Sequence, residues 1–193
     1  HELLYAMRAH GWSRSPYSYK KIAKQNPNLD PRFIFTNMGF NLRSTDIQAA
    51  IGLNQFKRLD HFSKKRKINR HKIINGLKKS KNWSNQFSFL EVPKKIDPSW
   101  FSLVILISDK LLNKKKKFIK YLTNKGIETR PIISGNFTNQ PAVKLFDLNP
   151  KNIKFPNADK IEKKGFFLGL KTENISNTKL NYLIKNLLKI DEI

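Results

Sequence analysis

The chain has 193 residues and no Cys, and 38 basic residues against 14 acidic ones give it a formal net charge of +24. Without Cys, it cannot form disulfides, thiolate zinc sites or Cys-ligated iron–sulfur clusters of its own. No apolar run approaches the roughly 20 residues of a membrane helix, so we expect no membrane partner. The first residues, HELLYAMRAHGW, read as the interior of a helix, and we therefore expect the chain to be a fragment.

The positive charge is spread along the whole chain. Lys supplies 30 of the 38 basic residues, whereas Arg, whose planar fork suits phosphates and bases, is scarce. Lys, Asn, Ile and Phe are all abundant, as in proteins encoded by AT-rich genes. We interpret the charge, including the run Lys114–Lys117, as solvated surface and expect no nucleic acid partner. A basic nucleic-acid-binding module is the alternative, because phosphate neutralisation drives such binding.

The first part of the chain is predicted to hold two helices. Apolar residues at helical spacing predict a helix over residues 1–9, ended by Gly11, and residues 16–31 form a polar connection. Thr45 and Gln48 make a T-x-x-Q capping box at the start of a second helix. This helix is apolar almost all round, so we expect it to be buried. Its apolar residues are Ile47, Ala49, Ala50, Ile51, Leu53 and Phe56.

From residue 61 onward, helices and strands are mixed. The run 101–107, which is apolar except for Ser102, predicts a buried strand, and Pro131 places the strand 127–133 at an edge or a bend. This mixture predicts an α/β or α+β small domain after the tail of another domain. In chain order the predicted elements are a basic helix (61–79), strands (87–92 and 101–107), a helix capped by Asn113 and ended by Gly126, a strand (127–133), helices (142–146 and 157–164), a strand (166–170) and a helix capped by Ser176.

A short polar motif, Gly39-x-Asn41-x-Arg43, precedes the capping box. An Asn amide and a guanidinium ahead of a helix N-terminus can both donate to an anion, and the helix dipole favours that anion. The alternative is that Asn41 fills a turn and Arg43 pairs with a surface acid. No two of the four His are spaced i, i+4, so a helical metal pair is absent and no metal site is predicted.

This motif is part of a longer pattern. Residues 39–55, GFNLRSTDIQAAIGLNQ, resemble the G-[YF]-N-x-R-x-x-[DE]-x-Q-A-A-x-G-x-x-Q signature of the sugar-nucleotide aminotransferases of the DegT/StrS type. RAHGW (8–12), GIETRPIISGNF (126–137) and FPNADKIEKKGFFLG (155–169) match in the same order. These relatives are pyridoxal-phosphate (PLP) enzymes. The resemblance implies an α/β chain that is the C-terminal portion of the aspartate-aminotransferase (type I PLP) fold: residues 1–62 end the large PLP-binding domain, and residues 63–193 form the small domain.

The resemblance also implies roles for single residues. Asn41 would reach across a homodimer interface to the cofactor phosphate of the partner subunit, and Arg43 would support this loop or the substrate diphosphate. His10 would lie near the cofactor pocket, with a structural role as the alternative. The other expected substrate-binding residues are Arg14, Arg130, Gly135 and Asn136, with a ligand-free Gly-Asn turn as the alternative for the last two. The Lys or His that reacts with the cofactor would lie upstream of His1, so no catalytic residue is expected in this chain.

One branch of the family resembles the chain most. RPIxxGNF, HGW and SWF (99–101) look like the nucleotide-sugar 3-dehydratases, in which His replaces the Schiff-base Lys. Their cluster-dependent subgroup carries Cys after HGW, where this chain reads SRSPYSYKK. We therefore expect part of a PLP- or pyridoxamine-phosphate (PMP)-dependent aminotransferase or cluster-free 3-dehydratase. It would act on a nucleotide-diphospho-4-keto-6-deoxyhexose in cytoplasmic biosynthesis of surface polysaccharide or deoxysugars. An inactive remnant is a further interpretation.

Overall fold

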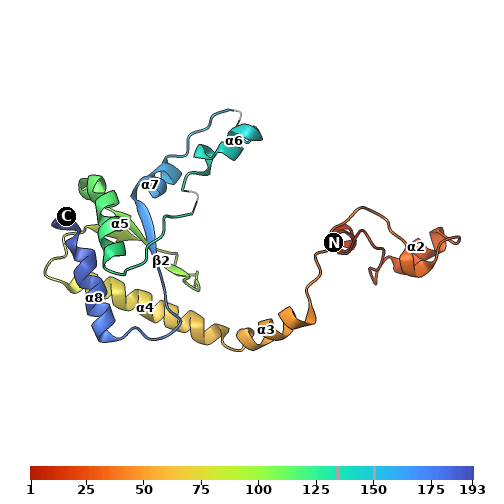
Figure 1. Cartoon of the computed structure of the whole chain (residues 1–193), viewed down its shortest axis with the longest axis horizontal. Helices are drawn as coiled ribbons and strands as arrows, with labels where there is room; N and C mark the ends of the chain where they lie inside the picture. Colours follow the sequence, from red (N-terminus) through yellow and green to blue (C-terminus); the bar gives the residue numbers. More distant parts are fainter. Residues whose placement is uncertain (134, 150) are drawn as a thin grey trace. The chain divides into compact units, whose positions relative to one another are not determined.

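The computed structural model describes residues 1–133, 135–149 and 151–193. The chain divides into two compact units, His1–Lys57 and Arg58–Ile193, whose elements are drawn in sequence colours in Figure 1. The predicted end of the large domain, residue 62, lies inside α4 (Leu59–Lys79), the first helix of the second unit. The assignment of these units to a large and a small domain stays a prediction.

The first unit consists of short helices and hydrogen-bonded loops. α3 begins as predicted: the Gln48 main-chain NH donates to Thr45 Oγ1 at 3.3 Å, and the Thr45 NH donates to Gln48 Oε1 at 2.9 Å. The predicted connection 16–31 is wrong in part, because it contains the helix α2. The elements are α1 (Glu2–Met7), α2 (Tyr19–Gln25), the 3-10 helix η1 (Pro31–Phe33) and α3 (Asp46–Phe56).

The helix α3 is exposed, which contradicts the expectation that it is buried. None of its residues is buried, and the side chains of Ile47, Leu53 and Phe56 are 74%, 68% and 71% exposed. An all-round apolar pattern shows that a helix needs an apolar neighbour, but it does not show where that neighbour comes from. Within the first unit, no segment covers this helix.

The second unit is built on a three-stranded antiparallel sheet in the order β1-β2-β3. Phe87 pairs with Ile107 and Ser102 pairs with Gly169, so β2 is the central strand. After α4, the elements are β1 (Phe87–Phe89), β2 (Ser102–Ile107), η2 (Asp109–Lys114), α5 (Lys115–Asn124), η3 (Phe137–Asn139), α6 (Pro141–Leu145), α7 (Pro156–Lys164), β3 (Gly165–Gly169), α8 (Asn177–Leu188) and η4 (Lys189–Asp191). In the described residues, no helix combines the length and apolarity needed to cross a bilayer.

The core of this unit lies between the sheet and its helices. The predicted buried strand is confirmed: every second residue of β2 is buried, with Leu103 and Ile105 fully inaccessible. Phe118 of α5 contributes its ring from the helical layer. Full burial of one such apolar side chain contributes about 1.5–3 kcal/mol. The remaining fully or nearly buried core residues include Ile73, Leu77, Phe87, Ile107, Leu122, Phe166 and Leu187. This side-chain set anchors α4, α5 and α8 to the sheet.

Two predicted features of the second unit are wrong. Residues 127–133 form no strand: the pairing found there is one isolated bridge, in which Arg130 and Phe167 exchange both main-chain hydrogen bonds. Asn113 does not cap α5, because it lies within the 3-10 helix η2 and Lys114 is the residue that precedes α5. The predicted strand 87–92 is also shorter and ends at Phe89.

The run Lys114–Lys117 is not simply solvated. Lys114 Nζ donates to the main-chain oxygen of Asp191 at 2.7 Å, and Lys115 Nζ donates to that of Lys163 at 2.8 Å. Lys117 Nζ donates to the main-chain oxygen of Ile193 at 2.9 Å. Carbonyls near helix C-termini have no partner inside their helix, and Lys side chains can satisfy them. Burial lowers the pKa of the Lys115 ammonium, with Glu162 acting in the opposite direction.

Candidate functional site

The first unit brings two of the sequence motifs together. Residues 8–12, RAHGW, run antiparallel to the segment that carries Asn41, with a bridge between Ala9 and Asn41. The His10 NH donates to the Phe40 carbonyl at 2.8 Å, and the Leu42 NH donates to the Arg8 carbonyl at 2.8 Å. His10 and Asn41, which the sequence separates widely, are thus held on adjacent stretches of backbone.

Two glycines allow this close approach. Gly11 has φ +81°, and a Cβ there would lie 1.6 Å from the main-chain oxygen of Asn37. A Cβ at Gly39 would lie 2.2 Å from Gly11 N. His10 also has a positive φ, 61°, which is uncommon for a residue other than Gly and costs on the order of 1–3 kcal/mol. We call residues 7–13 and 34–43 the glycine corner; its backbone path requires Gly at both positions.

An aromatic stack supports the glycine corner. The Trp12 ring stacks on Phe33 and Phe35, with centroids 5.6 and 5.7 Å away, and its Nε1 donates to the Arg32 carbonyl at 2.9 Å. The Arg14 guanidinium lies over the Trp12 ring at 3.6 Å, within the range of a cation–π contact. Arg14 therefore has a packing role here, and its expected substrate role stays a prediction.

Asn41 and Arg43 are the donors that the glycine corner presents. Both residues are exposed, and no hydrogen bond or ion pair of either side chain is found in the described part of the chain. They stand just ahead of the capping box of α3, whose N-terminus favours an anion. The alternative for Arg43, an ion pair with a surface acid, is not seen among the described residues. This arrangement can donate to a phosphate without giving up an internal contact.

The other predicted residues belong to the second unit. Arg130 Nη2 donates to Glu128 Oε1 at 2.9 Å, and Arg130 is bridged to Phe167 through its backbone. Asn136 is only 4% exposed, and both the nitrogen and the oxygen of its amide have partners: Nδ2 donates to Asp159 Oδ1 at 2.7 Å and Oδ1 accepts from the Thr138 NH at 3.1 Å.

Gly135, next to Asn136, has φ +48°, and a Cβ there would lie 2.7 Å from two side-chain carbons of Glu162. Gly135 and Asn136 thus build the turn before η3, and a substrate role for them stays a prediction. The predicted residues fall into two groups, with His10, Arg14, Asn41 and Arg43 in the first unit and Arg130, Gly135 and Asn136 in the second.

Sequence reasoning missed an aromatic pair beside Arg130. Phe101 and Phe167 meet edge to face with centroids 6.2 Å apart, and both line a cavity of about 430 Å³ together with Arg130 and Glu128. The available signal was the alternation of β3, which turns Phe167 away from the buried Phe166. Among the described residues, no cluster of His, Asp and Glu could hold a metal ion.

Comparison with known families identifies the class of protein to which this fold and the glycine corner belong. Residues 1–187 match the DegT/DnrJ/EryC1/StrS aminotransferase family. The chain therefore belongs to this family. This confirms the resemblance drawn from the four sequence motifs and the expected partial type I PLP fold.

Within this family, the chain is similar to several individual proteins. GDP-4-keto-6-deoxy-D-mannose 3-dehydratase of Escherichia coli O55:H7 is 30% identical over 88% of this chain and 42% of its own length. The lipopolysaccharide biosynthesis protein RfbH of Salmonella typhimurium is 29% identical over 80% of the chain and 34% of its own length. A solved structure of the E. coli 3-dehydratase with bound hydrated PLP superposes with a TM-score of 0.74 at 26% identity, covering 96% of this chain and 46% of that one. The chain thus spans less than half the length of these relatives.

Proposed function

We propose that the chain is the C-terminal part of a PLP/PMP-dependent enzyme that acts on a nucleotide-diphospho-4-keto-6-deoxyhexose, in the biosynthesis of surface polysaccharide, including lipopolysaccharide, or of deoxysugars. The glycine corner carries this proposal. It holds the H-G-W and G-x-N-x-R motifs side by side and leaves the exposed side chains of Asn41 and Arg43 without a partner among the described residues. Family membership over residues 1–187 supports the same class of chemistry.

The residues present fit part of a PLP site. Asn41 and Arg43 would hold the cofactor phosphate, because both are exposed donors ahead of the N-terminus of α3. His10 would lie at the edge of the cofactor pocket, and the groups that hold the ring would come from the rest of the enzyme. When bound, the cofactor supplies the carbonyl or amine and the electron sink for the reaction.

The proposal includes a homodimer in which Asn41 donates to the phosphate held by the partner subunit. Support comes from the exposed apolar residues of α3, which follow directly after this loop and are suited to an interface. It also includes a cytoplasmic location, which fractionation of cells and detection of the complete enzyme would test.

Arg130 is the chain's candidate contact for the substrate in the second unit. It lines a cavity with Phe101 and Phe167, where a guanidinium suits a diphosphate and aromatic faces suit an apolar sugar face or a base. Arg130, which pairs with Glu128, would exchange this ion pair for one with the substrate diphosphate. We place the diphospho-sugar in this cavity.

The decisive experiment uses the complete polypeptide that contains this chain. It is incubated with GDP-4-keto-6-deoxymannose, PLP or PMP, and glutamate, and the sugar product is read by NMR. Loss of the hydroxyl at carbon 3 supports the 3-dehydratase, and a new amine at carbon 3 or 4 supports the aminotransferase. If the complete polypeptide binds PLP but leaves both this sugar and its TDP and CDP counterparts unchanged, the proposed substrate class is wrong.

A further inference from the structure

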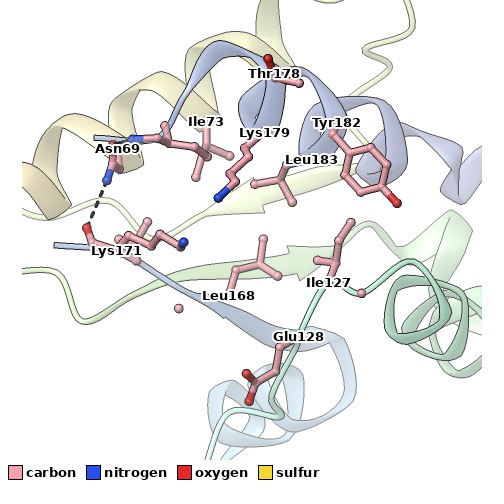
Figure 2. Close-up of a pocket in the computed structure, with 14 residues that line it drawn as sticks. Asn69, Ile73, Ile127, Glu128, Leu168, Lys171, Thr178, Lys179, Tyr182 and Leu183 are labelled. Carbon is pink, nitrogen blue, oxygen red and sulfur yellow. Dashed lines mark hydrogen bonds between the residues drawn. The ribbon is translucent and has the colours of Figure 1, made fainter. Parts of the chain in front are cut away.

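A cavity of about 500 Å³ lies within the second unit, and none of the residues that line it is a predicted site residue. It opens between α4, α8, the end of β3 and the loop after α5, as Figure 2 shows. Its interior is apolar, and its volume falls in the range of small-molecule sites, roughly 300–1,000 Å³. The apolar residues that line it are Ile73, Ile127, Leu168, Leu170, Ile175 and Leu183.

The walls of the cavity are fixed by hydrogen bonds. Asn69 of α4 is fully buried, and its Nδ2 donates to the Lys171 carbonyl at 3.1 Å while its Oδ1 accepts from the Ile175 NH at 3.1 Å. On the opposite side, the Tyr182 hydroxyl donates to the Lys125 carbonyl at 3.0 Å. These hydrogen bonds join α4 to the loop 171–175 and α8 to the residue after α5. They fix the walls of the cavity, which is therefore preformed.

The opening of the cavity is cationic. Figure 2 shows Lys171 and Lys179 with their ammonium groups turned toward the cavity, and neither ammonium has an ion pair or hydrogen bond to another described residue. The one carboxylate in the lining, Glu128, is already paired with Arg130. An apolar interior below two free ammonium groups matches a molecule with an apolar body and one negative end.

We propose that this cavity binds a free medium-chain carboxylate. The carboxylate would lie between Lys171 and Lys179, where charge-assisted hydrogen bonds are available. The alkyl chain would lie against Leu168, Leu183 and their apolar neighbours, and each methylene removed from water adds to affinity. A nucleotide fits less well, because the interior has few groups to pair with a base or a ribose. This binding activity does not depend on the proposed sugar chemistry.

Calorimetric titration of the 193-residue chain tests the ligand class. Decanoate is the probe, acetate reports charge attraction alone, and decanol reports apolar burial alone. We expect one saturable site for decanoate, with an affinity at least tenfold above that for either control ligand. Weak unsaturable binding of decanoate, or equal affinity for decanol, would overturn the proposal.

Variants locate the site. Lys171→Met with Lys179→Met is expected to weaken decanoate binding about tenfold, whereas Lys110→Met with Lys120→Met, the same charge change at exposed positions, leaves it unchanged. Thr178→Trp places a ring at the exposed rim of the cavity and is expected to abolish binding, with circular dichroism confirming an unchanged fold.

If both double Lys variants lose the same decanoate affinity, decanoate is attracted to the whole basic surface, and the proposed site is refuted. The same conclusion follows if decanoate, or vesicles of phosphatidylglycerol, bind the Thr178→Trp variant as well as the parent chain.

Discussion

Gly39→Ala adds one methyl group to the glycine corner, and the free energy by which it destabilises the corner can be estimated from the backbone geometry. The new Cβ would lie 2.2 Å from Gly11 N, and 2.6 Å from both His10 C and Met7 O. All three are main-chain atoms, so no side-chain rotation relieves the clash and the two segments must separate. Overpacking of this kind costs about 1–3 kcal/mol, and at ~1.4 kcal/mol per decade the local opening becomes roughly five- to a hundredfold more frequent.

Amide hydrogen exchange, followed by NMR on the 193-residue chain, measures this opening directly. The reporters are the amides of His10, Phe40 and Leu42, which donate across the glycine corner, and their protection is expected to fall by the same factor. Gly52→Ala is the matched control: a Cβ there meets no atom within 4 Å, and Ala favours a helix by about 1 kcal/mol. Unchanged protection of the three amides in Gly39→Ala would refute the argument.

Three further predictions concern the cofactor and the charge. In the complete enzyme, Asn41→Ala is expected to weaken PLP binding roughly ten- to a hundredfold, because a hydrogen bond to a charged group is worth about 1.5–3 kcal/mol. Mixed dimers with subunits defective in their own cofactor pocket should regain activity, and mixed dimers that form but stay inactive contradict the contact in trans. The 193-residue chain alone is expected to show no absorbance band of bound PLP, since the ring-binding groups are expected elsewhere; such a band would disprove this. Its DNA binding is expected to be weak and sequence-blind, and to lose on the order of 10³ in affinity by 200 mM salt; selective binding at that salt concentration argues against a solvated surface.

Features that depend on neighbours in the sequence could be predicted. The capping box of α3 needs only Thr45 and Gln48, three residues apart, and the cap of α8 needs only Ser176, which accepts from the Lys179 NH at 3.4 Å. The strand β2 was predicted because residues 101–107 are apolar except for Ser102 and the run is too short for a typical helix. These signals are local, so the rest of the fold does not alter them.

Features that depend on distant partners could not be predicted. The glycine corner joins His10 to Phe40, and the sequence shows the two glycines without showing that they touch. Lys115 looked like a solvated residue because its carbonyl partner, Lys163, lies far along the chain. For the same reason the buried Asn136 could not be distinguished from a ligand-binding Asn, since its partner Asp159 belongs to α7.

The contact between Gly11 and Gly39 also bears on how this corner can evolve. A side chain at either position collides with main-chain atoms, and every amino acid carries those atoms. A substitution at one glycine therefore has no compensating substitution at the other. Over evolutionary time the pair is expected to show no correlated change, because each position stays fixed independently. Methods that search for covarying residues will therefore miss this contact.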